Sequence, residues 1–215
     1  MSRSSGYRLL AAIVLIASSV GCASSNLELR ELKGGVQVAL QRGSGWTTLT
    51  VKPPYVIGPR ATMQIKGNVA SGNLDGRALK LNIGRDGIHG QGPYGNVNVE
   101  IYDTQGALTI EGTWNDSRVH FKVTGESLRG TIPVWNDNSS PIRTSQNCQY
   151  VLDKVAPDGS RMGSSICNGM PENTRIEMPA QVQDLLTRAE LTVVLLALLS
   201  TPPSTYQERN PLSDE

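Results

Sequence analysis

The sequence predicts a mainly β protein, an antiparallel meander that closes as a barrel or stacks as a sandwich, with one C-terminal helix. Three observations support this fold class. Apolar and polar residues alternate repeatedly from Val36 onward, which is the period of a strand with one buried face. The chain has 22 glycines and 12 prolines, which suits many turns. Near the C-terminus, apolar residues recur at helical spacing.

The length of 215 residues suits one well-packed domain with appendages. Residues 1–21 have the pattern of a signal peptide, and residues 22–35 of a tether. We expect a single β-rich domain over 36–200 and a disordered tail over 201–215, where prolines and polar residues dominate.

The clearest strands each carry three alternating apolar side chains: Leu79, Leu81, Ile83; Val97, Val99, Ile101; and Val119, Phe121, Val123. Less regular strands are expected at 36–40, 47–51, 63–65, 108–110 and 128–132. Closing or stacking such short strands would protect their edges.

Two stretches of the β-rich region resemble each other. MQIKG at 63–67 corresponds to LTIEG at 108–112, and residues 74–90 correspond to 114–130 at a spacing of 40. Each longer stretch has an Asp-containing turn, a strand with alternating apolar residues, and a Gly-containing turn before a short strand. We therefore expect a duplicated three-strand unit, although similar turn chemistry could produce the same likeness.

The segment 136–178 differs in character from the strands before it. Residues 136–147 are polar and rich in turn formers, and a strand is expected where CQYVLDKV begins at Cys148. In an oxidising compartment Cys148 and Cys167 would form a disulfide. Its loop of about 20 residues would contribute roughly 3 kcal/mol in the chain-entropy model.

A helix is predicted over 179–200, with Pro179 in its first turn. Its apolar face would carry Val182, Leu185, Ala189, Val193, Leu196 and Leu199. Charged residues at 184, 188 and 190 leave too short an apolar run for a membrane span. The helix is therefore expected to pack across the sheet or on a partner.

The N-terminus has the pattern of an export signal. Arg3 and Arg8 precede the apolar run at 9–17, which is too short to cross a bilayer, and small residues follow it. Ser19-Val20-Gly21-Cys22 then resembles the lipobox of bacterial lipoproteins.

That resemblance implies a diacylglycerol joined to the Cys22 thiol, cleavage before Cys22, and acylation of the new amino terminus. Ala23 in place of Asp implies sorting to the outer membrane, facing the periplasm or the surface. The anchor would also use the third cysteine once Cys148 and Cys167 are paired. Ser19 stands where the family favours Leu, and the small residues would also suit an ordinary signal peptidase that releases a soluble protein.

The charge pattern identifies no particular partner. The formal net charge is +1 and forms no basic stripe, so nucleic acid is not expected as a partner. The expected contacts are membrane lipid through Cys22 and an envelope protein or glycan.

No catalytic constellation is visible in the sequence. GQGPYG at 90–95 matches a dinucleotide-loop pattern, but a strand follows it where that loop needs a helix. His89 and His120 fit exposed strand positions, and no cofactor or metal motif is present. Trp46, Trp114 and Trp135 are candidate contacts for a ligand such as a glycan.

We therefore expect a lipid-anchored envelope protein with a β-rich binding or scaffolding domain and no enzymatic activity. Two alternatives remain open. One is an envelope hydrolase acting on glycan or peptide, which would show His89 or His120 beside a carboxylate in a cleft. The other is a carrier, which would enclose an apolar ligand in a cavity lined by large apolar side chains.

Overall fold

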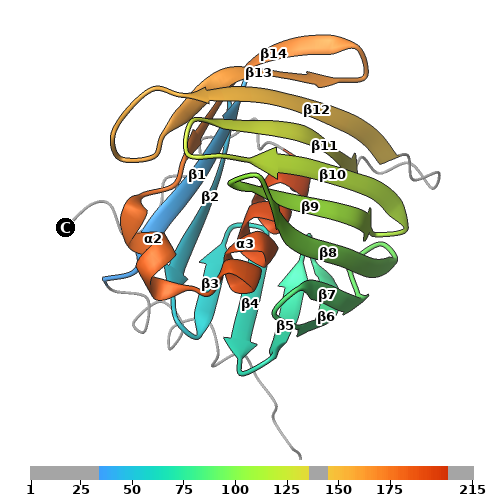
Figure 1. Cartoon of the computed structure of the whole chain (residues 1–215). Helices are drawn as coiled ribbons and strands as arrows, with labels where there is room; N and C mark the ends of the chain where they lie inside the picture. The colour runs from blue at the N-terminus through green and yellow to red at the C-terminus, as the bar shows by residue number, and fades with distance from the viewer. Residues whose placement is uncertain (1–33, 136–144, 203–215) are drawn as a thin grey trace, which may run out of the picture. The chain divides into compact units, whose positions relative to one another are not determined.

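The structure is a computed structural model that describes residues 34–135 and 145–202. Within these residues, fourteen antiparallel strands form a closed barrel (Figure 1). The strands are β1 (Val36–Arg42), β2 (Gly45–Lys52), β3 (Tyr55–Gly58), β4 (Ala61–Lys66), β5 (Val69–Leu74), β6 (Arg77–Ile83), β7 (Gly87–Gln91), β8 (Asn96–Thr104), β9 (Ala107–Trp114), β10 (Ser117–Val123), β11 (Ser127–Trp135), β12 (Ser145–Lys154), β13 (Arg161–Cys167) and β14 (Met170–Glu177).

The meander closes as a barrel rather than stacking as a sandwich. Each strand pairs with its sequence neighbours, and β1 pairs with β14 through contacts such as Leu40 opposite Ile176. Closure gives both β1 and β14 a partner on each side, so neither remains a free edge. The predicted fold class is confirmed, and every strand expected from alternation lies within a strand of the barrel.

The C-terminal segment forms two helices, α2 (Ala180–Leu185) and α3 (Arg188–Ser200). The prediction of one continuous helix over 179–200 is wrong at 186–187, where the backbone is extended. Thr187 caps α3: its hydroxyl accepts from the Glu190 N–H, and the Glu190 carboxylate accepts from the Thr187 N–H at 2.7 Å. This capping box starts a new helix where the apolar pattern alone suggests continuity.

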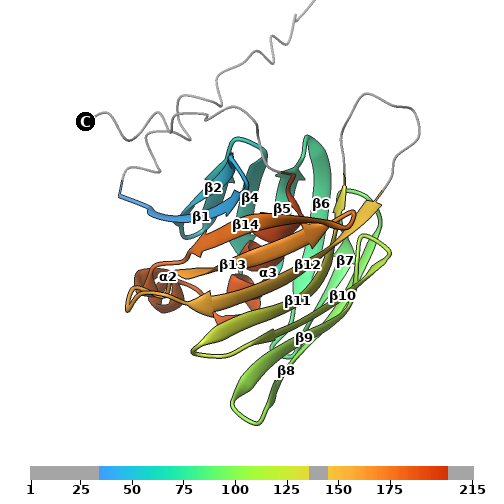
Figure 2. The ribbon, with the colours of Figure 1, turned by 90° about the horizontal axis from the view of Figure 1, so that it is seen from above.

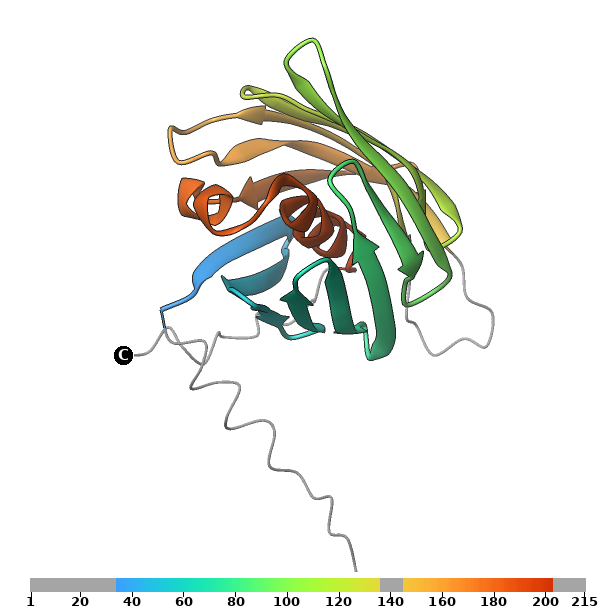
Figure 3. The same ribbon diagram turned by 60° about the horizontal axis from the view of Figure 1, so that its bottom comes forward.

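Helix α3 lies inside the barrel, enclosed by strands, as Figures 2 and 3 show from two directions. It packs against β1, β2, β7 and β11, and ten of its thirteen residues are buried. The expectation of a helix with one apolar face packed across a sheet is therefore corrected. A helix that is apolar all round belongs in a core, whereas Leu185 on α2 is exposed.

The helix completes a core that the strands cannot fill by themselves. Interior side chains pack well in a barrel of about eight strands, and larger barrels leave space along the axis. Here α3 occupies that space, and its Leu196, Leu198 and Leu199 are fully buried in the same apolar core as strand residues such as Phe121 and Ile110. No helix among the described residues has the length and apolarity to span a membrane.

The 40-residue repeat corresponds to two three-strand units, β5–β6–β7 and β9–β10–β11. In each unit the first turn has two residues at positive φ: Asp75 and Gly76 in one, Asn115 and Asp116 in the other. Such paired positive φ values match the twist of tight hairpins. The shorter match fails, because 63–67 covers β4 and its turn whereas 108–112 lies inside β9.

Equivalent glycines in the two units have the same packing. A Cβ atom at Gly90 would lie 2.3 Å from the Lys80 carbonyl oxygen, and one at Gly130 would lie 2.1 Å from the His120 carbonyl oxygen. A side chain at either position would collide with the backbone of the preceding strand. Each unit therefore has a glycine at a position where the backbones of two neighbouring strands approach closely.

The first prediction concerns the packing of α3. Leu196→Ala should lower the free energy of unfolding by about 2–5 kcal/mol, because it leaves a cavity at the barrel axis. Leu185→Ala, on the exposed side of α2, is the matched control and should change it by about 0.5 kcal/mol or less. Urea unfolding followed by tryptophan fluorescence measures both. Equal effects would show that α3 does not form the core.

Candidate functional site

The two ends of the barrel carry different residues, because turns alternate between the ends of an antiparallel meander. We call the end nearest α2 and the start of α3 the α2 end; its turns are 53–54, 67–68, 84–86, 105–106, 124–126 and 155–160. The opposite end is the disulfide end, with turns 43–44, 59–60, 75–76, 92–95, 115–116 and 168–169.

The predicted disulfide is present and the predicted lipid site lies elsewhere in the chain. Cys148 and Cys167 are bonded, and they face each other directly on the adjacent strands β12 and β13. Cys22 and its neighbours lie outside the described residues. The pairing of Cys148 with Cys167 leaves Cys22 as the third cysteine of the chain.

All three tryptophans lie at the disulfide end, but they do not form one ligand platform. Trp114 is fully buried in the core. Trp135 is half-buried and stacks on Tyr94 at 5.1 Å between ring centroids, with the Arg77 guanidinium 4.9 Å from the Tyr94 ring. Trp46 lies on β2. Four strands lie between β2 and β11, the strand that carries Trp135, along one side of the barrel.

A cavity of about 660 Å³ opens at the α2 end of the barrel. We call it the mouth groove. Strand turns line one side, and the first turn of α3 lines the other. Its lining residues are Gly67, Asn68, Ile83, Gly84, Arg85, Asp86, Tyr102, Asp103, Thr187, Arg188, Ala189 and Glu190.

Both signs of charge meet in the mouth groove. The Arg188 guanidinium contacts the Asp103 carboxylate at 2.5 Å, which joins α3 to the end of β8. Arg85 and Asp86 from the turn between β6 and β7 line the same space. The groove therefore offers hydrogen-bond donors and acceptors side by side, together with the Tyr102 ring, which is 37% exposed.

A second, shallower cavity of about 470 Å³ continues from the mouth groove onto the outer face of the barrel. The two cavities share Gly84, Asp86 and Tyr102, and the outer one adds His89 and Glu100. His89 Nδ1 lies 2.7 Å from the Asn98 side-chain oxygen. This contact with an amide, rather than a carboxylate, gives the hydrolase alternative no specific support.

Three polar side chains form a row across β8, β9 and β10 on the outer face. His120 Nδ1 lies 3.4 Å from the Glu111 carboxylate, and both side chains are about half exposed. A hydrogen bond to Glu111 is the main cause that raises the pKa of the Tyr102 hydroxyl, followed by burial and by the charges of Glu111 and Glu100. His120 thus lies beside the Glu111 carboxylate on an exposed surface, and the Tyr102 hydroxyl on β8 forms a hydrogen bond with the same carboxylate.

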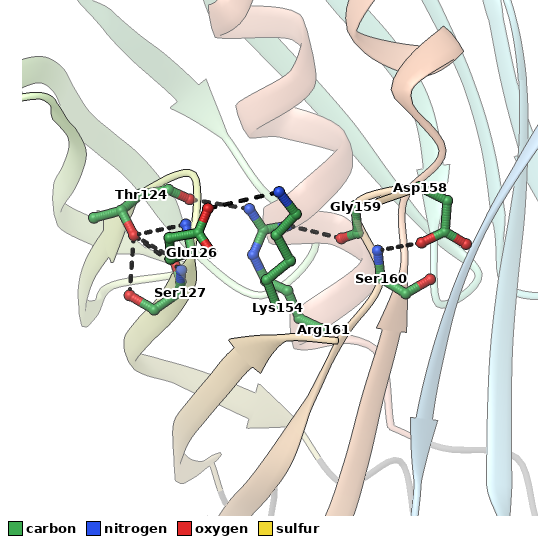
Figure 4. Close-up of polar contacts among 8 residues, drawn as sticks. All are labelled: Thr124, Glu126, Ser127, Lys154, Asp158, Gly159, Ser160 and Arg161. Carbon is green, nitrogen blue, oxygen red and sulfur yellow. Dashed lines mark hydrogen bonds and ion pairs between the residues drawn. The ribbon is translucent and has the colours of Figure 1, made fainter. Parts of the chain in front are cut away.

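Arg161 forms a further cluster at the α2 end, shown in Figure 4. Its guanidinium donates to the carbonyl oxygens of Thr124 at 3.0 Å and Gly159 at 3.1 Å. Burial lowers the pKa of Arg161, and the charge of Glu126 partly opposes that shift. The side chain thereby ties the turn between β10 and β11 to the loop between β12 and β13.

The same two turns are held by contacts beside Arg161. Lys154 lies 3.6 Å from the Glu126 carboxylate, and the Thr124 hydroxyl accepts from the Ser127 N–H at 2.9 Å. These contacts satisfy polar groups within the turns themselves (Figure 4), which makes the cluster a structural brace of the α2 end.

Metal chemistry has no candidate centre in the described part of the chain, where no group of three or more His, Cys, Asp or Glu is placed to hold an ion. Sequence patterns did not identify the mouth groove, because its residues come from four separate segments. The Thr187-x-x-Glu190 spacing of a capping box was the one local signal that could have located its helical side.

Comparison with known protein families, with curated proteins and with solved structures gave no match. The fold and the groove define the chain as an antiparallel barrel filled by its own C-terminal helix, with a polar cavity at one end.

The second prediction concerns Asp158, whose carboxylate accepts from the Ser160 N–H at 2.8 Å. The hydrogen bonds from Ser160 are the main cause that lowers the pKa of Asp158. The resulting stabilisation is present above the unfolded-state pKa of about 3.9 and is lost as the pH falls through the folded-state pKa. Asp158→Asn should therefore lower the urea midpoint at pH 7, and its difference from wild type should shrink towards about pH 2.

The matched control for this pH dependence is Asp184→Asn, which changes an exposed carboxylate on α2. It should shift the urea midpoint less than Asp158→Asn at pH 7. A difference between Asp158→Asn and wild type that stays constant across the pH range would contradict the assigned role of the charge.

Proposed function

We propose that this chain is a lipoprotein of the bacterial cell envelope, anchored through Cys22, whose helix-filled barrel binds an envelope glycan in the mouth groove without catalysing a reaction. The observation that best supports a binding role is the mouth groove. It is open, about 660 Å³ in volume, and lined by charges of both signs beside an exposed tyrosine.

Placement of the ligand in the groove follows from the filled interior. Helix α3 takes the axial space of the barrel, so a ligand meets this domain at its ends or on its outer face. The filled interior also disfavours the carrier alternative, because α3 occupies the space that a carried apolar molecule would need. The hydrolase alternative stays a prediction.

A glycan suits the chemistry of the groove. Sugar hydroxyls donate and accept hydrogen bonds, and Arg85 with Asp86 supplies a donor and an acceptor from adjacent residues. The apolar face of a pyranose ring would pack on the exposed part of Tyr102. A few such polar groups fix the orientation of a ligand in a concave site.

Anchoring is supported by the N-terminal pattern and by cysteine parity. The small residues before Cys22 follow an apolar run, and the other two cysteines are paired with each other. Two or three acyl chains would hold the domain firmly on a membrane, since each buried CH₂ contributes about 0.8 kcal/mol. Ala23 after the cysteine favours the outer membrane, facing the periplasm or the surface.

The third prediction tests the anchor. Protein extracted from membranes should begin at Cys22, and its intact mass should include a diacylglyceryl adduct. Cys22→Ser removes the sulfur that accepts the lipid, so this variant should lack the adduct. A soluble wild-type product of unmodified mass would overturn the anchor and leave glycan binding to be judged separately.

The fourth prediction tests glycan binding by calorimetry with a soluble disaccharide-peptide fragment of the cell wall. Arg85→Ala and Tyr102→Ala should each weaken binding about fivefold or more, which corresponds to roughly 1 kcal/mol for a lost contact. Arg118→Ala is the matched control, because Arg118 is exposed on β10 and lies outside the mouth groove. Unchanged affinity in both groove variants, or no binding by wild type, would refute this site.

A further inference from the structure

The barrel interior becomes polar at the disulfide end, next to the C-terminal end of α3. Arg42 on β1 is only 3% exposed, and Cys148 and Tyr150 on β12 are fully buried. The Thr174 hydroxyl donates to the Ser165 hydroxyl oxygen at 2.7 Å within the same region. A charged side chain in such a place requires close electrostatic partners.

Arg42 directs its guanidinium at the disulfide. One terminal nitrogen, Nη1, lies 3.7 Å from the Cys148 sulfur and 3.8 Å from the Cys167 sulfur. The other, Nη2, donates to the Thr201 carbonyl oxygen at the end of α3. The buried Nε has no hydrogen-bond partner among the residues that the structure describes.

Among the described residues, Arg42 has no full negative charge in contact with its guanidinium in the disulfide form. Arg42 forms no ion pair within the described ranges, and the helix carbonyl carries only a partial negative charge. Glu172 on β14 is an acidic group near this region. The charges of Glu172 and Arg42 both act on the Tyr150 hydroxyl, whose pKa is raised mainly by burial. A thiolate at the position of either sulfur would give Arg42 a full counter-charge in contact distance.

We propose that Cys148–Cys167 is a redox-active cystine that undergoes thiol–disulfide exchange with an external dithiol, and that Arg42 stabilises the Cys148 thiolate released in that exchange. The inference is independent of the lipid anchor and of the glycan groove. It assigns the disulfide a chemical activity in addition to its role as a crosslink between β12 and β13.

Exposure determines which sulfur is attacked. Cys148 is fully buried, whereas Cys167 is half-buried and directly precedes the exposed turn at Asn168 and Gly169. The thiolate of the external dithiol therefore attacks Cys167 and forms a mixed disulfide with it. The bond between the two sulfurs breaks, and its electron pair leaves on Cys148 as a thiolate beside Arg42.

The second thiol of the external dithiol completes the exchange. As a thiolate it attacks the sulfur of the external molecule in the mixed disulfide, which releases Cys167 as a thiolate that takes up a proton. The external dithiol is oxidised to a disulfide by two electrons, and Cys148 and Cys167 are reduced. A leaving thiol of lower pKa leaves faster, so Arg42 favours both the rate and the extent of reduction.

The test measures the equilibrium with dithiothreitol at pH 7 on the full chain, read by alkylation and mass spectrometry of the peptides that carry Cys148 and Cys167. Arg42→Gln should lower the equilibrium constant for reduction about tenfold, the factor for one pKa unit of thiolate stabilisation. Arg42→Lys keeps the charge and should stay closer to wild type. Arg161→Gln removes a half-buried arginine at the opposite end of the barrel and should leave the constant unchanged.

A second measurement separates charge stabilisation from structural support. In Cys167→Ser the Cys148 thiolate should form below the ordinary thiol pKa of about 8.5, and the pH dependence of alkylation measures its formation. Adding Arg42→Gln should move this titration to higher pH. Equal reduction constants for Arg42→Gln and Arg161→Gln would overturn the proposal even if Cys167→Ser fails to fold.

Discussion

The burial of α3 along the axis of a closed barrel is the constraint on which the rest of the structure depends. A sheet of fourteen strands encloses more space than its own inward side chains fill. The chain supplies the missing volume from α3, whose residues from Thr192 to Ser200 are all buried. The barrel and the helix therefore stabilise each other, because each would otherwise expose a large apolar surface to water.

A helix enclosed in this way must satisfy the polar groups at both of its ends within the protein. At its N-terminal end, Thr187 and Glu190 form a capping box. At its C-terminal end, the Tyr150 hydroxyl donates to the Leu199 carbonyl at 3.1 Å, and Arg42 donates to that of Thr201. The polar groups around the enclosed helix therefore lie at the two ends of the barrel, with the mouth groove at one end and the cystine beside Arg42 at the other.

Local patterns predicted a large part of the fold. Strands with regular alternation, such as β6, β8 and β10, were identified because each buries one face. Strand β13 was not predicted, because Gly163, Ser164 and Ser165 have the composition of a loop. In the structure these residues pair with β12 and β14. The residues of the mouth groove come together only when four distant segments meet at one barrel end, and no spacing in the sequence encodes that meeting.

The sequence by itself determined the features whose physics is local: alternation for strands, tight-turn residues for hairpins, and the cysteine pair for a crosslink. It also contains the lipobox-like residues around Cys22, a short contiguous motif on which the proposed lipid anchor rests. Only the tertiary structure decided that the meander closes as a barrel, that α3 lies inside it, and that Arg42 faces the disulfide across 106 residues of chain. Those outcomes depend on filling an enclosed volume and on balancing a buried charge, and both are properties of the assembled fold rather than of any one segment.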